Sequence, residues 1–181
     1  MSTSIFLATS LDGYIARADG RIDWLPATDD IEPHGFEEFF ASADALVIGR
    51  GTYDTVIGFG GWGYGKKPVV VLTAKPELVR PPKEAVCEVM SGEPASIVAH
   101  CAERGWEQLY VDGGVTITRF LEAGLIDRMI ITRIPILIGS GIPLFGPLTR
   151  DIRWKHVRTQ VYKGGLVQSE YVRDDQPARI G

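Results

Sequence analysis

The sequence has few of the residues that most often carry metal or nucleophilic chemistry. Its 181 residues include two cysteines, Cys87 and Cys101, and three histidines, and none of them lies in a recognised metal-ligand or catalytic spacing. The His-x-Glu and Pro-Cys-x-x-Cys signature of zinc deaminases is also absent. We therefore expect no metal site. Two cysteines without a pairing pattern favour a reduced, cytoplasmic protein.

The sequence also lacks an excess of positive charge and any long apolar run. The formal net charge of −4 at pH 7 argues against nucleic acid or an anionic membrane as the main partner. No stretch approaches the ~20 apolar residues of a membrane span, and the N-terminus lacks the basic segment and apolar core of a signal peptide. These absences predict a cytoplasmic protein that binds neither nucleic acid nor membrane.

Short apolar runs alternate with helical patterns along most of the chain, which predicts an α/β domain with a mostly parallel central sheet. The last two apolar runs are separated only by a short glycine turn, so they predict an antiparallel C-terminal hairpin. Residues 1–173 are expected to form one domain and residues 174–181 a frayed tail. The predicted strands are 5–9, 45–48, 68–73, 85–90, 106–111, 129–138, 154–162 and 166–172, and the predicted helices are 35–43, 49–57, 93–105 and 114–125.

The stretch from residue 45 to residue 53 predicts an anion-binding turn. Four apolar residues, 45–48, form a buried strand, and Gly49, Arg50, Gly51 and Thr52 follow where a helix begins. The first N–H groups of a helix lack intrahelical partners and carry the positive end of its dipole. A phosphate could approach the glycine backbone here. The alternative is a tight strand-to-helix turn with a surface arginine.

A second turn of the same kind follows the apolar residues 109–111, where Asp112, Gly113 and Gly114 precede a helical pattern. Two such turns at one edge of a sheet could hold the two ends of a dinucleotide. Neither has the G-x-G-x-x-G spacing, so a Rossmann site is excluded. Residues 60–66 match the glycine and lysine spacing of a P-loop, but Lys67 stands where Ser or Thr is required, and the segment follows a helix.

Five motifs in order resemble the dihydrofolate reductase-like family, and within it the stand-alone relatives of the riboflavin-biosynthesis reductase (RibD C-terminal) domain. The motifs are residues 10–16, 49–53, 72–75, 112–114 and 135–145. The resemblance implies a three-layer fold and an NADPH-dependent reductase. Its substrate would be a small heterocycle of the pyrimidine, pterin or flavin-precursor type, as in 5-amino-6-(5-phosphoribosylamino)uracil reductases. A non-catalytic NADP(H)-binding module is the alternative.

The resemblance also implies which residues bind NADPH. Thr73 and Lys75 match the position that holds the adenosine 2′-phosphate, and Ala8 and Ile15 would flank the nicotinamide. The complete expected cofactor set is Ala8, Ile15, Gly49, Arg50, Gly51, Thr52, Thr73, Lys75, Gly113, Gly114, Val115 and Thr116.

Three residues are expected on the substrate side: Asp112, Asp12 and Trp24. Asp112 matches an acidic residue that contacts substrate in the resembled reductase, although an aspartate before two glycines is also an ordinary turn or cap former. Trp24 lies in a long polar loop, residues 18–33, and would be a lid or wall residue or else a core plug that pins the loop.

Two departures from the family bear on the substrate. Neither Glu37 nor Glu38 matches the substrate-binding acid of true dihydrofolate reductases, so folate is not expected. Basic residues for a ribose phosphate are not evident either. A homodimer is expected from the edges of an open sheet, from the apolar run 134–138 beside a glycine-rich loop, and from the dimers of the resembled reductases.

Overall fold

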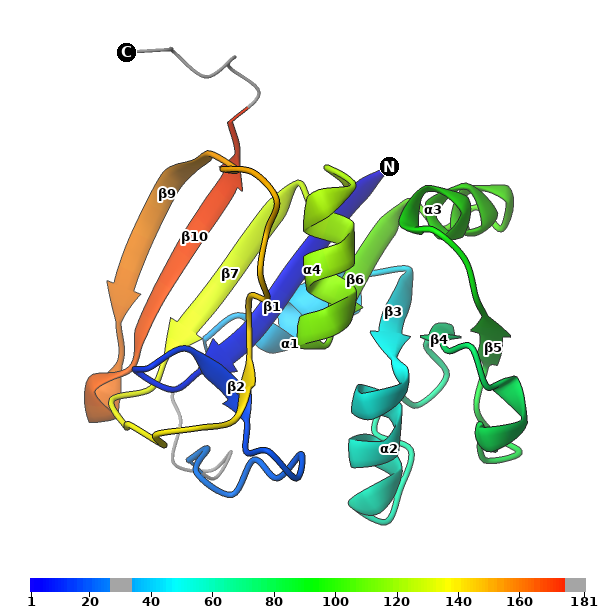
Figure 1. Ribbon diagram of the computed structural model, residues 1–181, viewed down its shortest axis with the longest axis horizontal. Helices are drawn as coiled ribbons and strands as arrows, with labels where there is room; N and C mark the ends of the chain where they lie inside the picture. The colour runs from blue at the N-terminus through cyan, green and yellow to red at the C-terminus, as the bar shows by residue number, and fades with distance from the viewer. Residues whose placement is uncertain (27–33, 175–181) are drawn as a thin grey trace.

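The computed structural model describes residues 1–26 and 34–174 and contains an eight-stranded sheet in the order β5-β4-β3-β6-β1-β7-β10-β9 (Figure 1). Neighbours from β5 to β7 pair in parallel, and β10 pairs antiparallel with β7 and β9. The predicted architecture is therefore confirmed. The strands are β1 (Ser2–Thr9), β3 (Ala45–Gly49), β4 (Val69–Leu72), β5 (Cys87–Met90), β6 (Gln108–Asp112), β7 (Arg128–Arg133), β9 (Trp154–Val161) and β10 (Val167–Arg173).

Helices cover both faces of the sheet, with α4 in front of it and α1 behind it in Figure 1. Successive strand residues point to opposite faces. Thus Ile5 packs with α3 and α4 residues, whereas Phe6 packs with Phe39 of α1 and Tyr53 of α2. The helices are α1 (Phe36–Ser42), α2 (Arg50–Gly58), α3 (Pro94–Glu103) and α4 (Gly114–Glu122), with 3-10 turns η2 (Pro76–Leu78) and η3 (Lys163–Gly165).

The apolar stretch 129–138 is not one long strand. β7 ends at Arg133, because Pro135 has no N–H to donate to a ladder. Ile134 is buried and Leu137 is 68% exposed. The edges of the main sheet are β5 and β9, so the run 134–138 does not form an exposed edge strand. A small second sheet, β2 (Tyr14–Ala16) with β8 (Ile142–Pro143), was not predicted from the sequence.

The glycine-rich segment that resembles a P-loop supports the fold through Lys67. Its Nζ donates to the carbonyl oxygens of Phe40 (2.7 Å), Ala41 (3.1 Å) and Ala43, at the end of α1. It also lies 5.0 Å from the centre of the Phe40 ring. A cation at a helix C-terminus satisfies carbonyls that lack intrahelical partners and interacts favourably with the dipole. This lysine therefore stabilises α1.

Two predicted segments lie partly outside the described residues. These are the loop 18–33, of which residues 18–26 are described, and the tail 174–181, of which residue 174 is described. Among the helices of the described ranges, none is long and apolar enough to cross a membrane.

Candidate functional site

One cavity of about 960 Å³ lies where β1, β3, β4 and β6 end. Its walls include the first turns of α2 and α4, because β3 passes directly into α2, and β6 reaches α4 through Gly113. Ligand sites in α/β proteins concentrate at the carboxyl ends of parallel strands, and ~300–1,000 Å³ is their usual size range. The cavity is therefore at the large end of that range.

The two strand-to-helix turns interlock through two glycines and two threonines. A Cβ added at Gly49 would lie 2.7 Å from Thr116 Oγ1, and one added at Gly113 would lie 2.6 Å from Thr52 Oγ1. Gly113 also has φ +98°, a conformation that side chains rarely adopt. Each threonine thus occupies space that the opposite turn leaves open by having glycine. This packing fixes the two helix starts against each other at the cavity.

The helix starts present unpaired donors to the cavity. The first N–H groups of any helix have no intrahelical partner. In α2 and α4 no side-chain cap accepts them either. Thr116, which is 5% exposed, also lines the cavity. No atom lies within 4 Å of where a Cβ on Gly51 would be. These groups fit an anionic ligand, because the free N–H groups at a helix start carry the positive end of the helix dipole.

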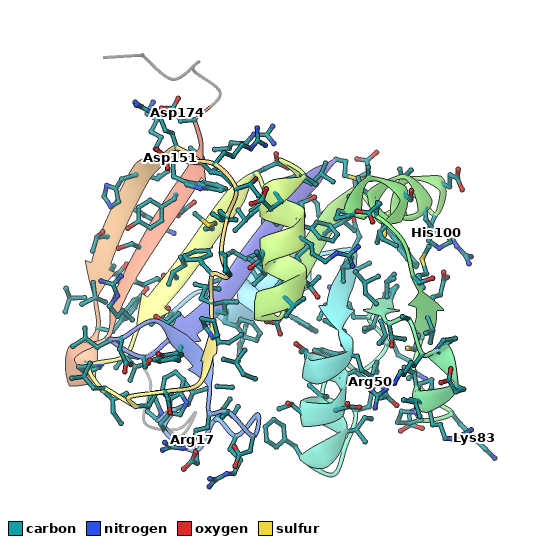
Figure 2. All side chains as sticks on the ribbon, in the orientation of Figure 1. Arg17, Arg50, Lys83, His100, Asp151 and Asp174 are labelled. Carbon is teal, nitrogen blue, oxygen red and sulfur yellow. The ribbon has the colours of Figure 1, made fainter. Side chains whose placement is uncertain are left out.

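Two arginines line this region, and each also lies near a carboxylate: Arg50 near Asp54, and Arg119 with its Nη2 3.7 Å from Glu93 Oε1. Arg50, labelled in Figure 2 where β3 passes into α2, donates from Nε to both carboxylate oxygens of Asp54 at 2.7 and 2.8 Å. Its terminal nitrogens make no hydrogen bond within the described chain. Arg119 of α4 donates from Nη2 to Gly92 O at 2.7 Å and also lines the cavity. Sequence reasoning missed Arg119, although its i, i+3 spacing from Thr116 would have placed both on one helix face.

Asp112 ends β6 and lies on the cavity wall, partly exposed there. Its Oδ1 accepts the N–H of Gly113 at 2.7 Å. Burial raises the pKa of Asp112 from 3.8 to about 6, and the hydrogen bond from Gly113 opposes that rise. A carboxyl group with this pKa exists in both protonation states close to neutral pH. Asp112 can therefore donate or accept a proton at the cavity.

Asp12 lies outside the cavity wall and joins two loops. Its carboxylate accepts the hydroxyl of Ser10 at 2.6 Å and the N–H groups of Gly139 at 2.8 Å and Ile138 at 3.3 Å. The hydrogen bond from Ser10 is the main cause that lowers the pKa of Asp12. An ionised acceptor has no proton to donate at neutral pH. The geometry gives Asp12 a structural contact between two loops, and its catalytic role stays a prediction.

Trp24 is placed in the interior and is not on the cavity wall. It is 7% exposed and packs with Ile134 and Leu166. Its buried Nε1 has no hydrogen-bond partner among the described residues. The neighbouring residues Ile22 and Leu25 line the cavity instead. This placement matches the alternative in which Trp24 pins the loop.

Thr73 and Lys75 follow β4 and are not part of the cavity wall, although Leu72 is. The backbone N–H of Lys75 donates to Thr73 Oγ1 at 3.0 Å. Their contact with a 2′-phosphate stays a prediction. The remaining sequence-predicted residues all line the cavity: Ala8, Ile15, Gly49, Arg50, Gly51, Thr52, Asp112, Gly113, Gly114, Val115 and Thr116. No group of three or more His, Cys, Asp or Glu side chains within residues 1–26 and 34–174 could hold a metal ion.

Known proteins are similar to this chain in sequence and in structure. The chain matches the RibD C-terminal domain over residues 3–168. YwjB of Bacillus subtilis strain 168 is 34% identical over 173 residues, which cover 94% of this chain and 97% of YwjB. A crystal structure from Shewanella sp. PV-4, named as a candidate riboflavin biosynthesis protein, is 39% identical with a TM-score of 0.86 and covers 96% of this chain and 99% of that one.

A more distant structure shares the fold. Dihydrofolate reductase from Enterococcus faecalis, solved with NADP(H) and the ligand RAB-propyl, has a TM-score of 0.68 at 19% identity. It covers 96% of this chain and 97% of its own. The fold is thus dihydrofolate reductase-like, as the five motifs implied. Because the domain match spans nearly the whole chain, this protein belongs to the RibD C-terminal domain family.

Proposed function

We propose that this protein is an NADPH-dependent reductase that transfers a hydride to a small heterocycle of the pyrimidine, pterin or flavin-precursor type. The observation that carries the proposal is the pair of interlocked helix starts at one cavity, with the hydroxyl of Thr116 and the cation of Arg50 beside them. Membership of the RibD C-terminal domain family supports it. So does the NADP(H) bound by the Enterococcus faecalis reductase that shares the fold.

Different residues along the cavity would bind the cofactor and transfer the proton. The first-turn N–H groups of α2 and α4, with Thr52 and Thr116, would bind the pyrophosphate. Ala8 and Ile15 would form the wall beside the nicotinamide, which supplies the hydride when bound. Asp112 would donate a proton to the substrate, because its pKa of about 6 is close to the working pH.

The preference for NADPH over NADH would come from Arg50 and Arg119. Both residues line the cavity, and a 2′-phosphate would add a charged partner for their guanidinium groups. A hydrogen bond to a charged group contributes about 1.5–3 kcal/mol. Loss of one such contact should therefore weaken NADPH binding about 10- to 100-fold.

The test is to titrate NADPH and NADH into the wild type, Arg50→Ala and Arg119→Ala. Lys83→Ala is the matched control, because Lys83 is an exposed cation that does not line the cavity. Lys75→Ala tests the sequence-based prediction for the 2′-phosphate. The proposal expects NADPH to bind more tightly than NADH, and this difference to shrink in the arginine variants. Equal affinities in the wild type would refute it.

Turnover separates the reductase from its alternative. NADPH oxidation should be followed with pyrimidine, pterin and flavin-precursor acceptors. Steady oxidation with any acceptor supports the reductase. Binding of NADPH without oxidation by any acceptor would favour the non-catalytic NADP(H)-binding module.

We also propose a cytoplasmic homodimer. The edge strand β9 is exposed along seven of its eight residues, including Val157 at 50% and Val161 at 68%. Exposed edge strands are often covered by another chain. Pairing of two copies would bury these valines.

A further inference from the structure

The cavity extends well beyond the two helix starts. Its other end lies between the turn of residues 18–22 and the C-terminal half of α2, where it is lined by Thr55, Val56 and Phe59. α2 has nine residues, so at 1.5 Å per residue its two ends are about 13 Å apart. We call this end, formed by residues 18–22, 55, 56, 58 and 59, the distal arm.

The distal arm has a defined backbone. Residues 17–21 form a tight turn, in which the N–H of Gly20 donates to Arg17 O at 2.9 Å and the N–H of Arg17 donates to Arg21 O at 2.8 Å. Gly20 has φ +84°, and a Cβ there would lie 3.1 Å from Thr55 Oγ1. The turn thus approaches α2 closely where Gly20 lies beside Thr55. This contact bounds the cavity at the distal arm.

The wall of the distal arm carries apolar side chains that are open to a ligand. Phe59 is 64% exposed although it faces the cavity. Val56 and Ile22 line the same part. The walls of ligand sites are mainly apolar and aromatic. Covering an exposed phenylalanine on a concave wall with a ring or alkyl group is favourable, because apolar surface is removed from water.

The distal arm offers little net positive charge. Arg21 lines it, but its Nε lies 2.7 Å from Asp19 Oδ2, and its Nη1 lies 3.9 Å from Asp23 Oδ2. The nearby Arg17 is paired with Asp23 at 2.6 Å. A phosphate placed here would have to compete with existing carboxylate partners.

We infer that the distal arm binds an uncharged aromatic or apolar substituent of the substrate, with Phe59 packed against it. This inference rests on the proposed function, because the reacting heterocycle would lie between the nicotinamide and Asp112. It narrows the substrate class to heterocycles that carry an apolar group. A ribose phosphate does not match the paired charges of this wall.

The experiment measures binding of three 5,6-diaminouracils to the protein in the presence of NADP+. The compounds carry on N6 no substituent, a phenyl group or a ribosyl phosphate. The phenyl compound should bind about 10-fold more tightly than the unsubstituted one, because its ring becomes buried. The ribosyl phosphate should give no such gain. Tightest binding of the phosphate compound, or no binding of any of the three, overturns the inference.

Two variants locate the effect. Phe59→Ala should lose the preference for the phenyl compound, whereas Phe145→Ala should keep it. Phe145 is 42% exposed and does not line the cavity, so it controls for loss of a surface phenylalanine. A phenyl preference that survives in Phe59→Ala overturns the inference.

Titration of NADP+ into the same samples keeps the two proposals apart. If NADP+ binds but no phenyl preference is found, the distal-arm inference fails and the proposed function stands. If the phenyl preference is found without NADP+ binding, the proposed function fails and the arm still binds an apolar group.

Discussion

Replacing Asp112 with asparagine should make the protein more stable at high pH and less active. The carboxyl of Asp112 has a pKa of about 6 in the folded protein, because burial disfavours its charged form, against 3.8 for an ordinary aspartate. The folded state therefore holds a proton that the unfolded state releases between these pH values. It follows that the wild type loses stability as pH rises from about 4 to above 6.

The size of the effect follows from the pKa values. At about 1.36 kcal/mol per pKa unit, the difference between 3.8 and about 6 corresponds to roughly 3 kcal/mol. Because Asp112 is partly exposed in the cavity, this is an upper bound on the gain of Asp112→Asn at pH 8. Asparagine can still accept the N–H of Gly113 through its Oδ1. Near pH 4, the variant and the wild type should have similar stability.

The assay combines denaturant unfolding with turnover. Free energies of unfolding of both proteins are compared at pH 4 and pH 8. NADPH oxidation is then measured across pH with the best acceptor. Loss of a general acid should lower turnover about 10²- to 10⁴-fold, while NADPH affinity is kept. In the wild type, kcat/KM should fall above pH about 6, because Asp112 then loses its proton. In the variant, kcat/KM should not show this fall.

Two results would contradict this reasoning. An Asp112→Asn protein that is no more stable than the wild type at pH 8 would mean that the carboxyl is not destabilised by burial. Unchanged turnover in a folded variant would remove Asp112 as the proton donor.

Two further predictions concern packing and assembly. Gly113→Ala should lower the free energy of unfolding by about 1–3 kcal/mol and weaken NADPH binding, because a Cβ there would be strained and would meet Thr52. Gly51→Ala, which has open space, should be neutral or slightly stabilising, and equal destabilisation of the two variants would contradict the proposed interlock. Light scattering should give about twice the chain mass of 19.8 kDa at micromolar concentration, and Val161→Lys should shift it toward the monomer, whereas a wild-type monomer would refute the homodimer.

The sequence alone determined the parts of this protein that depend on local pattern. Runs of apolar residues predicted the parallel strands, and Gly49 and Gly113 marked the two turns that open on the cavity. The two turns lie at the same edge of the sheet, because parallel strands have their carboxyl ends at one edge. That is why the residues predicted in these turns line the cavity together.

Only the tertiary structure decided which loop side chains reach the cavity. Trp24 and Leu25 are neighbours in the sequence, yet Trp24 is buried against Ile134 and Leu25 lines the cavity. Phe59 likewise faces a ligand space that exists only because the turn of residues 17–21 lies against α2. The direction of a loop side chain depends on contacts between segments distant in sequence. Periodicity carries no information about such contacts.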